Sequence, residues 1–283
     1  MMRPFRVVGS QGVTLAGVEA GPVDGAPLVF VHGFAQDHRS FQRTLMGPLA
    51  DRFRLIAFDL RGHGGSDRPE PSAAYSEGAR WAEDLEAVLR ARGAERPVIV
   101  AWSYGGIVVG DYLRHAGGDA LGGVVFVGAP LGVGRASKPW LGSAMLTHTR
   151  AMLADAAPER VAATHAFLAA CSAAPLDDEA RDLMIAMASA IPPHVRRGMF
   201  ARNESYENEL RALRRPVLAL HGARDEVILP AASEHVTRTV SGARAIVYDD
   251  VGHMPFIERP RDFERDLAAF ADSVGEGAKR AAT

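Results

Sequence analysis

Apolar residues gather in short runs that recur along the chain and are bounded by glycine, proline or aspartate. The runs are rich in β-branched residues and nearly continuous, as expected of strands covered on both faces. Amphipathic stretches of helical period separate them, for example at 77–92, 230–240 and 260–274. The runs predict strands at 27–32, 54–59, 97–102, 122–127, 216–221 and 243–248.

This alternation of strand-like and helix-like segments predicts an α/β fold with a doubly wound, mostly parallel sheet. One interval breaks it. Residues 131–213 contain no strand-like run, only helical segments at 143–154, 158–170 and 177–190. We interpret this interval as a helical cap inserted into a core that comprises residues 1–130 and 214–283.

The run 97–102 leads into a serine with small neighbours. Residues 101–106 read AWSYGG, and a second apolar segment follows at once. Small residues let a strand turn tightly into a helix, which lifts the serine hydroxyl out of the backbone. The usual pattern is G-x-S-x-G, and Ala101 stands in place of its first glycine. The spacing therefore predicts that Ser103 is presented at the carboxyl edge of the sheet.

Polar residues follow other runs too, and functional groups gather beyond the carboxyl ends of parallel strands. A serine hydroxyl becomes a nucleophile when a base takes its proton, and the base must be oriented by a third group. Ser103, Asp225 and His253 offer these three groups, each in a loop after a strand-like run. The 28 positions from Asp225 to His253 leave room for one helix, one strand and a short loop.

The chain resembles the α/β-hydrolase family over about residues 5–274. The order Ser, Asp, His is that of the family's catalytic triad. The resemblance implies that Ser103 is the nucleophile, His253 the base and then the acid, and Asp225 the group that orients the imidazole. It also implies an oxyanion hole made by the backbone N–H groups of Phe34 and Tyr104. The matching segments are 32–34 (HGF), 59–66 (DLRGHGGS), 103 with its small flanks, 222–225 (GARD) and 252–253 (GH).

Several other polar residues near these motifs have an alternative or a structural interpretation. Asp249 and Asp250 lie close before His253 and are alternative orienting acids, although a strand-end role suits them better. His32 is interpreted as structural. The turn residues Asp59, Arg61, His63 and Ser66 are interpreted as a structural network. Residues 62–65 (GHGG) lack the third glycine of a dinucleotide loop, because Asp67 takes its place. We predict neither a cofactor nor a metal, since the histidines lack the spacing of metal ligands.

The composition of the chain argues against several kinds of partner and covalent link. The chain has 283 residues, 47% of them hydrophobic, and a formal net charge of −2, which argues against a nucleic-acid or anionic-membrane partner. The lone Cys171 excludes an intramolecular disulfide. The N-terminus lacks the long apolar core of a signal peptide, and no uninterrupted apolar run approaches the length of a membrane span. We therefore expect a cytoplasmic protein, as a monomer or homodimer.

The predicted cap is expected to set specificity. It contains several methionines and aromatic residues, whose side chains suit an apolar pocket of adaptable shape. The alternative is that they form an ordinary helix core. The residues expected to contact substrate are Phe34, Tyr104, Met184, Phe200 and Met254.

Within the family, the cap and the 101–106 turn look most like small esterases and lactonases, including homoserine-lactone hydrolases. We therefore expect hydrolysis of a small carboxylic ester or lactone through an acyl-serine intermediate. Cofactor-free haloperoxidases or perhydrolases and carbon–carbon hydrolases use the same triad and stay open as alternatives. A non-catalytic small-molecule receptor is a further alternative. Epoxide hydrolases and haloalkane dehalogenases of this fold use an aspartate nucleophile, so Ser103 argues against both.

Overall fold

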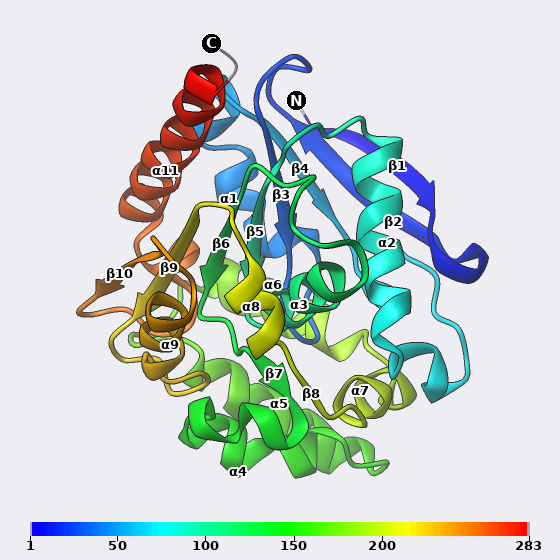
Figure 1. The fold of residues 1–283 in the computed structure, drawn as a ribbon. Helices are drawn as coiled ribbons and strands as arrows, with labels where there is room; N and C mark the ends of the chain where they lie inside the picture. The colour runs from blue at the N-terminus through cyan, green and yellow to red at the C-terminus, as the bar shows by residue number, and fades with distance from the viewer. Residues whose placement is uncertain (1, 282–283) are drawn as a thin grey trace.

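The computed structural model describes residues 2–281. An eight-stranded sheet lies at the centre of the molecule (Figure 1). The strand order is β1-β2-β4-β3-β5-β6-β9-β10, and β4 through β10 in that order are parallel. These parallel strands are β3 (Pro27–Val31), β4 (Arg54–Phe58), β5 (Val98–Trp102), β6 (Gly123–Val127), β9 (Val217–Gly222) and β10 (Arg244–Tyr248). The predicted α/β class is confirmed.

Two strands at one edge of the sheet contain no continuous apolar run and were not predicted from the sequence. β1 (Arg3–Val8) and β2 (Thr14–Ala20) pair antiparallel, and β2 continues antiparallel onto β4. Along β2, buried positions alternate with half-buried ones, because its two faces differ in burial. An edge hairpin of this kind has no continuous apolar run for a pattern search to detect.

Helices cover both faces of the sheet, as Figure 1 shows. On one face α2 (Gly78–Ala91) packs against α3 (Tyr104–Ala116), and on the other α1 (Gln42–Leu45) contacts α11 (Pro260–Ala281). α9 (Ala231–Thr239) contacts β9 and β10. All five residues of β5 are buried, so the strand that precedes Ser103 lies in the middle of the core.

The chain between β6 and β9 forms a helical layer beyond the carboxyl ends of the strands, at the bottom of Figure 1. Its helices are α4 (Ser143–Met152), α5 (Ala157–Ala170), α6 (Asp178–Ser189) and α7 (Pro193–Phe200), whereas the following α8 (Glu207–Ala212) packs against α3 and α9. The sequence predicted only helical segments between residues 131 and 213, but the structure also contains two short strands there. β7 (Gly132–Val133) pairs antiparallel with β8 (Glu204–Ser205) where the chain leaves and re-enters the sheet layer.

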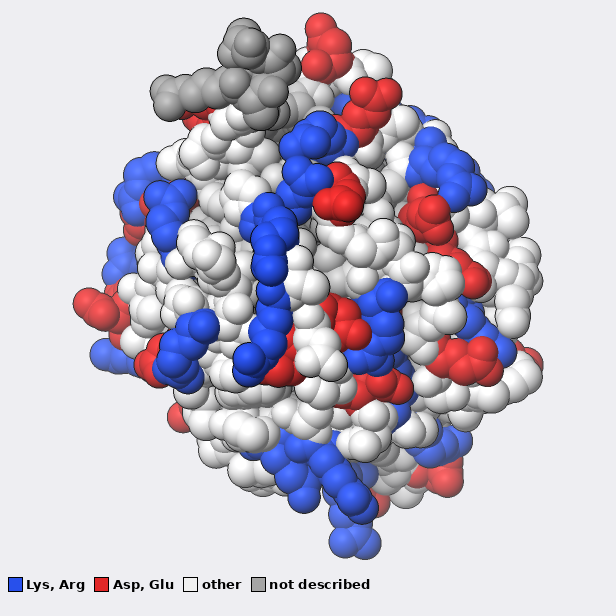
Figure 2. Space-filling model, in the orientation of Figure 1, with Lys and Arg blue, Asp and Glu red and all other residues white. Residues whose placement is uncertain are grey.

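Charged side chains of both signs are interspersed over the face drawn in Figure 2. Many of them pair, as Arg114 does with Glu204 and Glu209. Among the described helices, none is both long and apolar enough to cross a lipid bilayer.

A buried ion pair fastens the end of the helical layer to α3. Arg202, just after α7, binds the carboxylate of Asp111 in α3, and both side chains are almost fully excluded from solvent. The Tyr206 hydroxyl donates to the same carboxylate oxygen, at 2.7 Å. Arg202 also donates to the hydroxyl of Tyr104, at 3.3 Å. Removing one partner would leave the other as an uncompensated charge in the interior.

We expect Arg202→Met to lower the free energy of unfolding by about 3–5 kcal/mol, because it strands the Asp111 carboxylate in the interior. Arg211→Met is the matched control, since Arg211 pairs with Glu207 on the surface, where such pairs contribute about 1 kcal/mol or less. Urea unfolding of both variants measures the difference. Equal losses in the two variants would show that the buried pair does not fasten the layer.

Candidate active site

Ser103 occupies a strained turn between β5 and α3. Its φ of 52° and ψ of −118° are rare for any residue other than glycine, and such a backbone costs about 1–3 kcal/mol. Neighbouring segments approach closely: a methyl group at Gly105 would lie 2.3 Å from the carbonyl oxygen of Val31. The small residues on the carboxyl side of the serine are therefore required by packing. Ala101 is fully buried in β5, and the turn forms with its methyl group present.

His253 and Asp225 meet at hydrogen-bond distance. His253 lies in the loop after β10, Asp225 lies in the loop after β9, and His253 Nδ1 is 2.7 Å from Asp225 Oδ2. A carboxylate only accepts, so Nδ1 carries the proton and Nε2 is left as the acceptor. Gly128, at the end of β6, leaves space for this contact, since a methyl group there would lie 3.0 Å from Nδ1. The two alternative acids do not replace Asp225: Asp249 and Asp250 are exposed, and Asp250 pairs with Arg259.

The Asp225 carboxylate is saturated with donors. Burial alone would raise its pKa, but contacts with His253 and His221 outweigh burial and hold the pKa of Asp225 well below its usual range. Asp225 Oδ1 accepts the N–H groups of Val227 and Ile228, at 2.8 and 2.9 Å. These bonds fix both the charge of the carboxylate and its direction.

Because ionised Asp225 is stabilised in the folded state, it contributes to stability at pH values above about 4, where an unfolded aspartate is ionised. The contribution is lost as the pH falls through the lowered pKa of the folded protein. We expect Asp225→Asn to destabilise the protein at pH 7 and the gap to wild type to shrink as the pH falls below 4. Thermal unfolding across that range measures the gap, with Asp250→Asn as the exposed control. A gap independent of pH would contradict the assignment of a charged carboxylate.

Ser103 and His253 both line a cavity of about 390 Å³ between the sheet edge and the helical layer. Among the described residues no hydrogen bond joins the two side chains. Catalytic contacts of this kind often tighten only when substrate is bound. The remaining lining is largely apolar and comes from the loops after β3, β5 and β6 and from helices α4, α5, α6 and α7.

Four of the five residues predicted to contact substrate line this cavity, namely Phe34, Tyr104, Met184 and Phe200. The structure does not place Met254 with the other four. Its side chain is fully buried and does not line the cavity, although it follows His253 directly in the chain. Tyr104 lines the cavity but directs its hydroxyl to the carbonyl oxygen of Met199, at 3.2 Å. Burial raises the pKa of Tyr104 to about 12, so the phenol stays a donor.

The backbone N–H groups proposed for the oxyanion hole lie on two segments that meet at Ser103. Tyr104 is the first residue of α3, where an N–H has no acceptor within the helix. Gly33, just before Phe34, comes so close that a methyl group on it would lie 3.0 Å from Ser103 Cβ. Ala35, the residue after Phe34, has a φ of 56°, so a second strained backbone conformation borders the site.

Two residues near the site were given no role from the sequence. His221 Nε2 lies 2.8 Å from the carbonyl oxygen of Ile228 and 3.2 Å from Asp225 Oδ2. The Glu258 carboxylate accepts the N–H groups of Gly252 and Met254, on either side of His253. The order histidine–glycine at the end of the run 216–221 is a visible signal for the first. No sequence pattern marks Glu258, because it acts on backbone groups alone.

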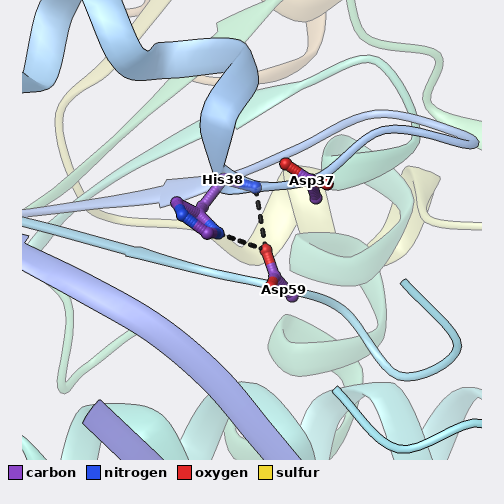
Figure 3. Close-up of side chains that lie close together, drawn as sticks. All are labelled: Asp37, His38 and Asp59. Carbon is purple, nitrogen blue, oxygen red and sulfur yellow. Dashed lines mark hydrogen bonds and ion pairs between the residues drawn. The ribbon is translucent and has the colours of Figure 1, made fainter. Parts of the chain in front are cut away.

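Figure 3 shows the one group of side chains, among those described, whose spacing suits a metal ion: Asp37, His38 and Asp59. Protein partners already occupy these ligand atoms. His38 contacts Asp59 Oδ1 through both its backbone N–H and Nδ1, at 2.9 and 2.7 Å, and Asp37 pairs with Arg39. Burial would lower the pKa of His38, but the bond to Asp59 outweighs it and raises that pKa. The cluster joins the turn after Phe34 to the end of β4.

A family model described as the alpha/beta hydrolase fold matches residues 26–260. The chain belongs to the α/β-hydrolase family. The crystal structure of the esterase RhEst1 from Rhodococcus sp. ECU1013 is 34% identical, covers 96% of this chain and 99% of its own, and has a TM-score of 0.91. A Burkholderia cenocepacia protein assigned as an aryl esterase is 30% identical over 97% of this hydrolase and 100% of its own chain, with a TM-score of 0.90.

A relative with a different name is also similar to this α/β-hydrolase. The non-heme chloroperoxidase of Streptomyces lividans is 27% identical over 283 aligned residues, which cover 94% of this chain and 99% of the relative. The shared family therefore establishes an esterase-like α/β-hydrolase. It leaves the choice of substrate to the local geometry.

Proposed function

We propose that this α/β-hydrolase cleaves small carboxylic esters or lactones through an acyl-Ser103 intermediate. The observation that carries the proposal is the arrangement at the cavity: Ser103 and His253 line one apolar cavity, and Asp225 holds the imidazole at 2.7 Å. The names of the esterase relatives agree with it. We also propose that residues 131–213 act as the cap that encloses the substrate.

In the proposed mechanism, the ester carbonyl carbon lies against Ser103 Oγ. His253 Nε2 takes the serine proton as Oγ attacks, and Asp225 stabilises the imidazolium that forms. The N–H groups of Phe34 and Tyr104 donate to the developing oxyanion, a contribution worth about 3–4 kcal/mol per donor. The intermediate collapses when His253 gives its proton to the departing alkoxide, which leaves the acyl group on Ser103.

The second half of the cycle repeats these steps with water. His253 Nε2 deprotonates a water molecule that attacks the acyl carbon, and the same N–H groups stabilise the second oxyanion. Collapse returns the proton to Ser103 and releases the carboxylic acid. With hydrogen peroxide in place of water, the same intermediate would yield a peracid, which is how perhydrolase or haloperoxidase activity would arise at this site.

The cavity lining favours substrates with an apolar acyl or aryl group. Phe34 packs edge-on against Phe200, with ring centroids 4.8 Å apart. Met145, Phe167 and Met184 lie on the helices that face the sheet edge and line the same space. Each methylene buried there contributes about 0.8 kcal/mol to binding.

We expect Ser103→Ala to lower kcat for aryl and alkyl esters by at least about 10⁴-fold, because the variant lacks the oxygen that carries the acyl group. Its thermal unfolding should match or exceed that of wild type. Initial rates on a panel of aryl esters, alkyl esters and lactones measure the loss and rank the substrate classes. A variant that keeps near-full ester turnover would overturn the proposal. Faster bromide oxidation with peroxide than ester hydrolysis in wild type would favour the haloperoxidase alternative.

A further inference from the structure

A second cavity, of about 570 Å³, lies against α5, α6 and the segment that joins them. Most of its lining is small or apolar, including Ala169, Pro175, Leu176 and Ile185. The charged Arg181 that borders it is paired with Asp178 and Asp182. The second cavity thus offers apolar surface without an unpaired charge from this arginine.

The second cavity shares a wall with the active-site cavity. Leu168 and Met184 line both cavities. The chain also passes from one to the other at the end of α5, where Cys171 lines the first and Ser172 the second. Burial raises the pKa of Cys171, so its thiol is neutral and adds no charge to the wall. Leu168 and Met184 therefore form part of the wall between the two cavities.

The wall includes the flexible side chain of a methionine, Met184. Methionine is unbranched and adapts to gaps of irregular shape. Met184 lines both cavities although its side chain is only 2% exposed. Met187, one turn further along α6, is equally buried but lines neither cavity, and its sulfur accepts from the Ser40 hydroxyl at 3.9 Å. The adaptable side chain therefore lies where the two cavities meet.

We propose that the second cavity binds the distal end of a linear alkyl chain of the ester substrate, which passes between Leu168 and Met184. This inference rests on the proposed esterase function and extends its substrates from small esters to esters that carry a linear alkyl chain. Continuity with the reaction site supports the assignment, since the carbonyl group would stay at Ser103 while the chain extends through an apolar wall. The alkyl chain comes from either the acyl or the alcohol side of the ester, and the two sources call for separate substrate series.

The test fills the second cavity from a residue that does not line the first. Ala169, on α5, is exposed at the second cavity, so Ala169→Phe adds bulk there and leaves the reaction site untouched. Two series are compared at monomeric substrate concentrations: p-nitrophenyl esters from acetate to laurate, and acetate esters from ethyl to dodecyl. In wild type, kcat/KM should rise by up to about fourfold per methylene for the longer members of one series. Ala169→Phe should lower it at least about tenfold for those members and less than about twofold for the shortest.

Ala166→Phe is the matched control, because Ala166 lies on the exposed side of the same helix and lines neither cavity. Ile185→Phe, from the facing helix, should repeat the effect of Ala169→Phe. The series that responds identifies the acyl or the alcohol side. If neither filled variant alters the long members more than the control does, the proposal is overturned while esterase activity stands. A wild type that hydrolyses no ester, even acetate, would overturn the proposed function itself.

Discussion

The left-handed backbone of Ser103 is the constraint on which the site depends. A serine with a φ of 52° persists only where the surrounding structure holds it in that conformation. Here Ser103 is held between the buried strand β5 and the start of helix α3. The same turn places the Tyr104 N–H at a helix start and brings Gly33 against the serine. The proposed nucleophile and oxyanion donors are thus held by packing of the core, before any substrate arrives. Preorganised donors of this kind need no rearrangement as charge develops.

The helical layer is tied to the proposed triad at several points, all through short contacts. The Cys171 carbonyl accepts the N–H of His253, at 2.8 Å, and Glu258 accepts the N–H of Ala173 as well as those beside His253. Arg202 fastens the far end of the layer to α3 through Asp111. The end of α5 is therefore hydrogen-bonded to the backbone of His253, and the end of α7 is tied to the helix that begins at Tyr104.

Chemistry at strand ends could be predicted from the sequence because it depends on residue type and chain order. Ser103 and Asp225 follow the buried strands β5 and β9, His253 follows the edge strand β10, and parallel strands bring their carboxyl ends to one edge. Side-chain direction could not be predicted in the same way. Met254 is adjacent to His253 in the chain, yet its side chain enters the core. Glu258 binds only backbone groups, which leave no mark in the residue pattern.

Edge and short strands were missed for a related reason. β1 and β2 are partly exposed, and β7 and β8 have two residues each, so none forms an apolar run. The metal-like spacing of Asp37, His38 and Asp59 was also invisible, because it arises from the packing of two separate loops. In each case the deciding contacts are between segments distant in the chain.

The acyl-serine intermediate is the central claim, and rapid quenching tests it most directly. Wild-type protein is mixed with an aryl ester, quenched with acid within the first turnover, and digested for peptide mass analysis. The account predicts one acyl group per chain, located on the peptide that contains Ser103, with its yield matched by the burst of released phenol. Ester turnover in the absence of any acyl-peptide, or an acyl group on another residue, would contradict the account.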